Sequence, residues 1–161
     1  MGALSLELTS EMFNNNQPMP SAYTCEGDNI SPPLQWSHPP HDTQSLVLIC
    51  DDPDAPDPAN PKMTWVHWVM YDIPVSSNSL SENISADETL DNGAHQGKTD
   101  FHKIGYGGPC PPIGSHRYFF KLYALDINLN LPAGKTKQEI ETAMEGHILD
   151  QGELIGTYQK S

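Results

Sequence analysis

Two short segments of the chain carry the residue types that could do chemistry. The first reads Gly114-Ser115-His116-Arg117-Tyr118, follows the proline-rich loop 107–112, and contains the only arginine of the sequence. It leads into the apolar and aromatic run 118–123, which is typical of a β-strand. Side chains alternate between the faces of a strand, so His116 and Tyr118 should share one face and Arg117 the other. An imidazole and a phenol are therefore predicted at one site where the strand begins.

The second segment supplies carboxylates and another imidazole. The aspartate-rich stretch 51–56 follows the apolar run 46–50, and Trp65-Val66-His67-Trp68-Val69 comes soon after it. Both stretches read as a strand joined to a loop, with the carboxylates at a strand end and His67 on the same face as Trp65. Carboxylate, two imidazoles, a phenol and exposed glycine amides of the 107–112 loop are groups that suit a small anion-binding pocket.

Several separated strings then make the chain resemble a known family. DDPDAP, VHW, GYGGPCPP and SHRYFFKLYALD resemble the phosphatidylethanolamine-binding protein family, in its bacterial and archaeal Raf-kinase-inhibitor-like branch. YTCEGDNISPPLQW near the start and AMEGHILDQGELIGTY near the finish resemble the same branch, so the likeness runs nearly end to end. The resemblance implies a fold of two packed antiparallel β-sheets with Greek-key connections and a peripheral helix.

The resemblance also implies which residues bind a ligand. In relatives, the corresponding groups line a shallow cavity that accepts phosphate-like anions such as the phosphoethanolamine head group. Carried over position by position, the ligand-binding residues are Asp52, His67, Gly108, Pro109, His116 and Tyr118. The resemblance further implies a regulatory or inhibitory role towards a kinase or protease, and a homodimer.

Three other residues, Asp54, Pro56 and Arg117, are predicted to support the site. Arg117 should point away from the pocket, and its planar fork could clamp the carboxylate of Asp54 and lock the two loops together. Pro53 and Pro56 restrict the aspartate loop, and a cis peptide bond before one of them would help to aim the carboxylate. The sequence leaves open which proline that would be.

Other chemistries are weighed against the binding module. Asp52 with His67 or His116 could act as a general acid and base in a hydrolase or isomerase of a small phosphorylated or ester substrate. The chain has no G-x-S-x-G nucleophile motif, which disfavours the enzyme. His67, His116 and Asp52 could form a two-histidine, one-carboxylate metal site, but no short two-ligand spacing supports it. We therefore predict a non-catalytic protein with no metal and no cofactor.

The remaining pattern predicts a single, mainly β domain over residues 1–161. Thr136 with Glu139 forms a capping box, and the apolar stripe that follows predicts one helix that includes His147 as a buried residue. The predicted extended pieces are residues 4–8, 22–25, 34–36, 46–50, 65–71, 118–123 and 154–158. Residues 75–99 are polar and irregular and predict a long loop, in and beside which His95 and His102 should be solvated.

Net charge, the N-terminal sequence and the cysteines indicate which partners and which cellular compartment to expect. A formal charge of −13 disfavours nucleic acid and stable association with anionic membranes. The N-terminus has neither the basic region nor the apolar length of a signal or a membrane span, so the cytoplasm is expected. Cys25, Cys50 and Cys110 are odd in number and their spacing pairs none of them, which leaves their redox state open. Cys50 is predicted to be a small buried hydrophobe and Cys110 a spacer in the pocket loop.

Overall fold

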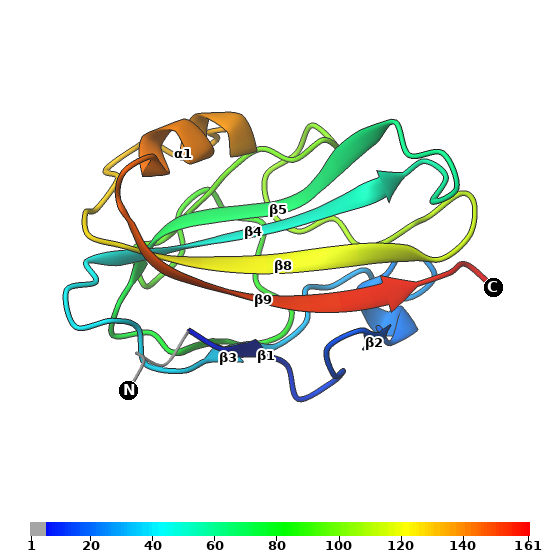
Figure 1. Cartoon of the computed structure of the whole chain (residues 1–161), viewed down its shortest axis with the longest axis horizontal. Coiled ribbons are helices and arrows are strands. Elements are labelled where there is room, and N and C mark those ends of the chain that lie inside the picture. The colour runs from blue at the N-terminus through cyan, green and yellow to red at the C-terminus, as the bar shows by residue number, and fades with distance from the viewer. Residues whose placement is uncertain (1–5) are drawn as a thin grey trace.

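The computed structural model describes residues 6–161 and shows two β-sheets with one α-helix packed against the larger sheet (Figure 1). The elements in chain order are β1 Leu8–Thr9, β2 Gln17–Pro18, the 3-10 helix η1 Ser21–Tyr23, β3 Leu34–Trp36, β4 Ser45–Ala55, β5 Met63–Pro74, β6 Ser79–Leu80, β7 His95–Gln96, β8 His116–Leu125, α1 Lys137–Met144 and β9 Ile148–Tyr158. Leu4 and Ser5, the first part of the predicted N-terminal strand, lie outside the described residues.

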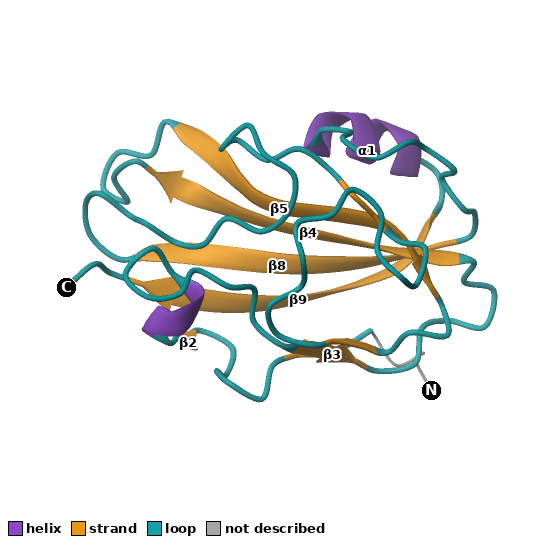
Figure 2. Cartoon of the chain, turned by 180° about the vertical axis from the view of Figure 1, so that it is seen from behind, coloured by secondary structure: helices purple, strands orange, loops and turns teal. Residues whose placement is uncertain are grey.

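The larger sheet has the strand order β2-β9-β8-β4-β5-β7, and the smaller sheet has the order β1-β3-β6. All pairings are antiparallel except the short one between β2 and β9. In the larger sheet β8 lies beside β4 rather than beside β7, so its run β8-β4-β5-β7 follows Greek-key order. The predicted two-sheet architecture is confirmed, and most of the chain outside the long strands is loop (Figure 2).

Both faces of the larger sheet are covered, which explains the unbroken apolar run at the start of β4. Leu46, Leu48 and Cys50 belong to the core that also contains the smaller sheet. Val47 and Ile49 belong to a second core that includes Ile140 and Met144 of the helix. A strand that is buried on both faces needs apolar residues at every position instead of at alternate ones.

The helix begins as predicted and ends earlier than predicted. The Thr136 hydroxyl accepts from the backbone N–H of Glu139, and the Glu139 carboxylate accepts from the backbone of Thr136, which completes the capping box. Gly146 has a φ of 80° just beyond the last turn, a backbone conformation that favours glycine and stops the helix. His147 therefore lies outside the helix, with its ring bonded to Asp126 and its side chain 40% exposed. The prediction of a buried His147 is wrong.

The structure also corrects one prediction near the N-terminus and decides the state of the cysteines, which the sequence left open. Residues 21–23 form η1 instead of an extended piece, because the backbone turns and the N–H groups of Tyr23 and Thr24 bond to carbonyls three residues earlier. Cys25 and Cys110 are joined in a disulfide with a Cα–Cα distance of 5.4 Å. They are 85 residues apart in the sequence, so no local spacing reveals the pair. Cys50 is buried and free, as predicted.

Within residues 6–161, no helix has the length and apolar character needed to cross a membrane. The disulfide is a feature of proteins in oxidising compartments and of some intracellular proteins of hyperthermophiles. The cytoplasmic location therefore stays a prediction.

Candidate functional site

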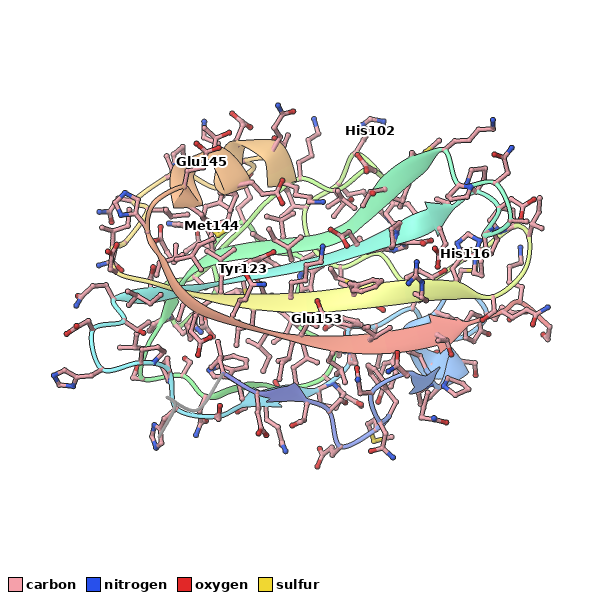
Figure 3. All side chains as sticks on the ribbon, in the orientation of Figure 1. His102, His116, Tyr123, Met144, Glu145 and Glu153 are labelled. Carbon is pink, nitrogen blue, oxygen red and sulfur yellow. A yellow bond between two sulfur atoms is a disulfide. The ribbon has the colours of Figure 1, made fainter. Side chains whose placement is uncertain are left out.

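The site lies where three central strands meet the loops. Asp52 in β4 pairs with Trp65 in β5, and β8 lies on the other side of β4, so the two sequence segments converge. Figure 3 places His116 at the beginning of β8. A cavity of about 280 Å³ opens at this point, and its walls are Asp52, Ala55, Pro56, Met63, Trp65, His67, Phe101, Cys110, Pro111, Pro112, His116 and Tyr118. The predicted convergence of the acid, both imidazoles and the phenol is therefore observed.

Strand alternation decides which aspartate faces the cavity. Asp51 points to the helix-covered face of the sheet, where its carboxylate contacts Lys121 at 3.2 Å and Lys137 at 2.8 Å. Asp52 points to the opposite face and lines the cavity. Only one of the two neighbouring carboxylates is therefore available to the site.

The Asp52–His116 pair forms the floor of the cavity. The Nδ1 atom of His116 lies 2.6 Å from Oδ2 of Asp52, and Nε2 lies within 3.0 Å of the carbonyl oxygens of Pro56 and Ile113. Every one of these partners is an acceptor, so each ring nitrogen needs a hydrogen between it and its partner, and the pair has no net charge. His116 is 1% exposed and has no ring nitrogen left over for a ligand.

His67 has the opposite arrangement of its ring. Its Nδ1 donates to the carbonyl oxygen of Gly107 at 2.6 Å, which leaves Nε2 of the neutral ring as an acceptor. Burial lowers the pKa of His67 below its ordinary value of 6.5, although the Gly107 carbonyl and the nearby charge of Asp52 oppose that shift. The ring is therefore neutral near pH 7, with an acceptor that has no protein partner among the described residues.

Tyr118 supplies the hydroxyl of the site. It is 1% exposed, lines the cavity, and packs edge-on against His67 with ring centroids 5.1 Å apart. Burial raises the pKa of Tyr118 above its ordinary value, and the charge of Asp52 adds to the rise. The phenol therefore stays protonated and can donate a hydrogen bond.

The loop that contains Gly108 and Pro109 contributes to the cavity in a different way from the one predicted. Gly108 is buried, and its N–H donates to the Asn29 side chain at 2.8 Å instead of facing the cavity. Gly108 and Pro109 do not line the cavity, whose wall at this point is made by Cys110, Pro111 and Pro112. The expected exposed glycine amide is thus occupied, because the loop packs against a segment from the N-terminal part of the chain.

Arg117 and Asp54 form the predicted clamp. The guanidinium donates from Nε and Nη2 to the two carboxylate oxygens of Asp54 at 3.0 and 2.9 Å, and the Arg117 backbone N–H adds a third bond at 2.9 Å. Asp54 is buried, whereas the Arg117 side chain is 53% exposed. The peptide bond between Ala55 and Pro56 is cis, so Pro56 is the proline in question. The clamp joins the aspartate loop to the beginning of β8.

We expect Arg117→Ala to lower the free energy of unfolding by about 2 kcal/mol at pH 7, because it leaves the buried Asp54 carboxylate with fewer donors. Hydrogen bonds from Arg117 lower the pKa of Asp54 below its ordinary value of 3.8. A depressed carboxylate pKa stabilises the fold above the unfolded-state value and loses that effect as pH falls through the folded-state value. The difference between wild type and variant should therefore shrink below about pH 4. Urea unfolding at several pH values measures it, and an equal melting temperature at pH 7 would contradict the clamp.

The apolar wall was largely missed by the sequence reasoning. Trp65 and Phe101 meet edge to face with centroids 5.6 Å apart, and Phe101 also packs against His67 at 5.4 Å. Met63 and Pro112 complete this side of the cavity. Trp65 could have been found, since strand alternation places it on the face of His67. Phe101 lies in the irregular connection, and no local pattern marks it.

Residues 9–159 match the family model described as phosphatidylethanolamine-binding protein. A UPF0098 protein of Methanothermobacter thermautotrophicus is 48% identical over 155 residues, which cover 96% of this chain and 99% of the relative. The chain belongs to the phosphatidylethanolamine-binding protein family.

Solved structures of family members share the fold. A putative phosphatidylethanolamine-binding protein homologue, CT736 from Chlamydia trachomatis, superposes with a TM-score of 0.88 at 41% identity and covers 98% of this chain and 99% of its own. E. coli YbcL, described as a new member of the mammalian family, has a TM-score of 0.87 at 29% identity and covers 98% and 100%. The predicted family and fold are confirmed.

The geometry of the cavity is also relevant to the two alternatives, an acid-base enzyme and a metal site. Tyr118 is the only hydroxyl among the cavity-lining residues, and its raised pKa makes it a poor nucleophile. None of the matched family names denotes an enzyme. No group of three side chains suited to a metal occurs among residues 6–161, and both nitrogens of His116 already have partners. Neither the acid-base enzyme nor the metal site gains support.

Proposed function

We propose that this protein binds a small acidic ligand, such as a phosphate-like group that carries an organic substituent, in the cavity between β4, β5 and β8. The observation that carries the proposal is the pairing of one free donor with one free acceptor on the cavity wall. The Tyr118 hydroxyl can donate to an oxyanion, and Nε2 of His67 can accept from a protonated ligand oxygen. Asp52 and His116 satisfy each other and act as a neutral floor.

The apolar wall supports a ligand that is larger than a bare anion. Trp65, Phe101, Met63 and Pro112 surround the polar groups, so an organic substituent would replace water against these side chains. A cavity of about 280 Å³ is at the small end of ligand sites. Phosphoethanolamine and small phosphomonoesters fit this description better than inorganic phosphate does.

The proposal makes affinity depend on pH through His67. Protonation turns Nε2 of His67 from an acceptor into a donor, and a bound anion would favour that charged ring, so binding takes up a proton. Because burial lowers the pKa of free His67 and a bound anion raises it again, affinity for an anion should rise as pH falls through the bound-state pKa and should level off only below the lowered pKa of the free protein. Calorimetric titration with O-phosphoethanolamine measures the rise. Sulfate is the control ligand, because its own charge does not change between about pH 5 and 8.

Replacing Tyr118 by phenylalanine removes the donor without emptying the space of the ring. We expect Tyr118→Phe to weaken the binding of O-phosphoethanolamine by about tenfold or more, as for the loss of one charge-assisted hydrogen bond. Tyr123→Phe is the matched control, since Tyr123 lies further along β8, beyond the cavity (Figure 3). Equal affinities of the two variants would refute the donor role, and a pH-independent affinity for sulfate would refute the role of His67.

The partners of the protein stay predictions of the family resemblance. These are a homodimer and the inhibition or regulation of a kinase or protease. Met63 and Ile113 are exposed apolar residues at 48% and 53%, and Met63 belongs to the cavity wall, so a second chain could bury this rim. Light scattering of wild type against Met63→Ser/Ile113→Ser tests the dimer through this rim.

A further inference from the structure

A segment from the N-terminal part of the chain holds the loop that forms one wall of the cavity. We call residues 23–29 the brace. The Cys25 N–H donates to the Pro109 carbonyl at 3.0 Å, and the Asn29 side chain accepts from the Gly108 N–H at 2.8 Å. The Tyr106 hydroxyl donates to the Tyr23 carbonyl at 2.8 Å. The disulfide between Cys25 and Cys110 is the single covalent bond in this contact.

The braced loop controls two properties of the ligand site. Its Gly107 carbonyl accepts the hydrogen bond that Nδ1–H of His67 donates, and this leaves Nε2 as the free acceptor. Its next residues, Cys110, Pro111 and Pro112, line the cavity. The position of the loop therefore sets both the tautomer of His67 and the shape of the wall.

The contact between brace and loop is tight, and its far side is anchored. A Cβ atom placed on Gly108 would lie 2.3 Å from the Tyr23 carbonyl oxygen and 2.4 Å from Oδ1 of Asn29, so the loop can sit here only with a glycine. The Glu26 carboxylate accepts from the Tyr158 hydroxyl at the end of β9 and from the Ser161 N–H. The brace thus links the end of β9 to the loop that forms the cavity wall.

We propose that the Cys25–Cys110 disulfide is a redox switch for ligand affinity at the cavity of the proposed function, on which this inference rests. Both cysteine residues are exposed, so a dithiol reductant can reach the bond. A thiolate of the reductant attacks one sulfur to form a mixed disulfide, and the other cysteine leaves as a thiolate and takes up a proton. The second thiol of the reductant then displaces the first cysteine. Two electrons and two protons reach the protein, and the dithiol becomes a disulfide.

Reduction weakens ligand binding because it lets the loop of the cavity wall move. Three hydrogen bonds remain between brace and loop, and without the covalent bond they can open by local unfolding of the brace, whose residues 25–29 are exposed. A loop that is no longer fixed must be ordered when the ligand binds, and that ordering opposes binding. The Gly107 carbonyl also leaves His67 for part of the time, so both tautomers of the ring become populated.

The test compares oxidised protein with protein reduced by dithiothreitol, with O-phosphoethanolamine as the probe and calorimetry as the readout. We expect reduction to weaken binding by about tenfold. The double variant Cys25→Ser/Cys110→Ser should bind like the reduced protein under both conditions, and Cys50→Ala, which keeps the disulfide, should still respond to reduction. Equal affinities of oxidised and reduced wild type overturn the switch.

A second measurement needs no ligand and separates this inference from the proposed function. In the oxidised protein the Nδ1–H proton of His67 should give a slowly exchanging NMR signal, because its hydrogen bond to Gly107 is buried. Reduction should broaden or remove that signal while the circular dichroism spectrum stays the same. A signal that is unchanged on reduction overturns the coupling. Absence of binding in both redox states, together with a signal that responds, overturns the proposed function and leaves the coupling standing.

Discussion

Replacing His116 by alanine is expected to lower the free energy of unfolding by about 3 to 5 kcal/mol at pH 7. The reason is the carboxylate that the substitution leaves behind. Asp52 is 3% exposed, and His116 supplies the hydrogen bond to its Oδ2, while Oδ1 accepts, within residues 6–161, only from the Asp54 N–H. Without the imidazole the buried charge is uncompensated, and the carbonyls of Pro56 and Ile113 also lose their donor. Urea unfolding followed by tryptophan fluorescence measures the loss.

His41→Ala is the matched control, since His41 is exposed and should change stability by less than about 0.5 kcal/mol. The double variant Asp52→Ala/His116→Ala provides the stronger test. Once the buried carboxylate is gone, removal of His116 should cost clearly less, so the two single losses should exceed the loss of the double variant. Additive losses would mean that Asp52 and His116 do not depend on each other.

The second large effect is expected at Gln96, a residue to which the sequence reasoning gave no role. Gln96 is fully buried in β7, and its side-chain oxygen accepts from Nε1 of Trp68 at 2.7 Å. Its amide nitrogen donates to the carbonyls of Ser85 and Asp87 at 2.7 and 2.8 Å. We expect Gln96→Ala to lower the free energy of unfolding by about 3 kcal/mol, because three buried partners lose their hydrogen bonds.

Measuring Gln96→Ala in a Trp68→Phe protein separates the contribution of the Trp68 hydrogen bond from that of the packing of Gln96. In a Trp68→Phe protein the indole donor is absent, so Gln96→Ala should cost about 1 kcal/mol less than in the wild type. Gln151→Ala, at an exposed position of β9, should change stability little. An equal cost of Gln96→Ala in both backgrounds would show that the Trp68 bond contributes nothing to stability.

The site combines residues from rigid strands with loops that single side chains hold in place. The long strands β4, β5 and β8 provide Asp52, His67 and Tyr118 directly, and their register fixes the distances between them. The connections are held by the hydrogen bonds of single side chains. Gln96 pins residues 85–87, and Asn29 pins Gly108. A substitution of Gln96 or Asn29 should therefore affect the loops more than the strands.

Local sequence patterns determined much of the architecture and part of the site. Alternation along residues 116–118 correctly placed His116 and Tyr118 on one face and Arg117 on the other, because side-chain direction in a strand depends only on the backbone period. The capping box located the beginning of the helix, since its hydrogen bonds join residues three apart. The clamp between Arg117 and Asp54 was predictable for a related reason, because a lone guanidinium opposite a carboxylate has few other partners.

Tertiary structure decided everything that depends on contacts between distant parts of the chain. The Cys25–Cys110 disulfide, the burial of the Gly108 amide against Asn29, and the role of Phe101 in the cavity wall all join segments that no local pattern relates. The backbone partners of the two imidazoles were also undetermined, since they are carbonyls of loops whose path depends on packing. Short-range periodicity therefore specified which strand side chains face the cavity, and only the packed chain specified the loop side chains of its wall and which polar atoms are still free to bind a ligand.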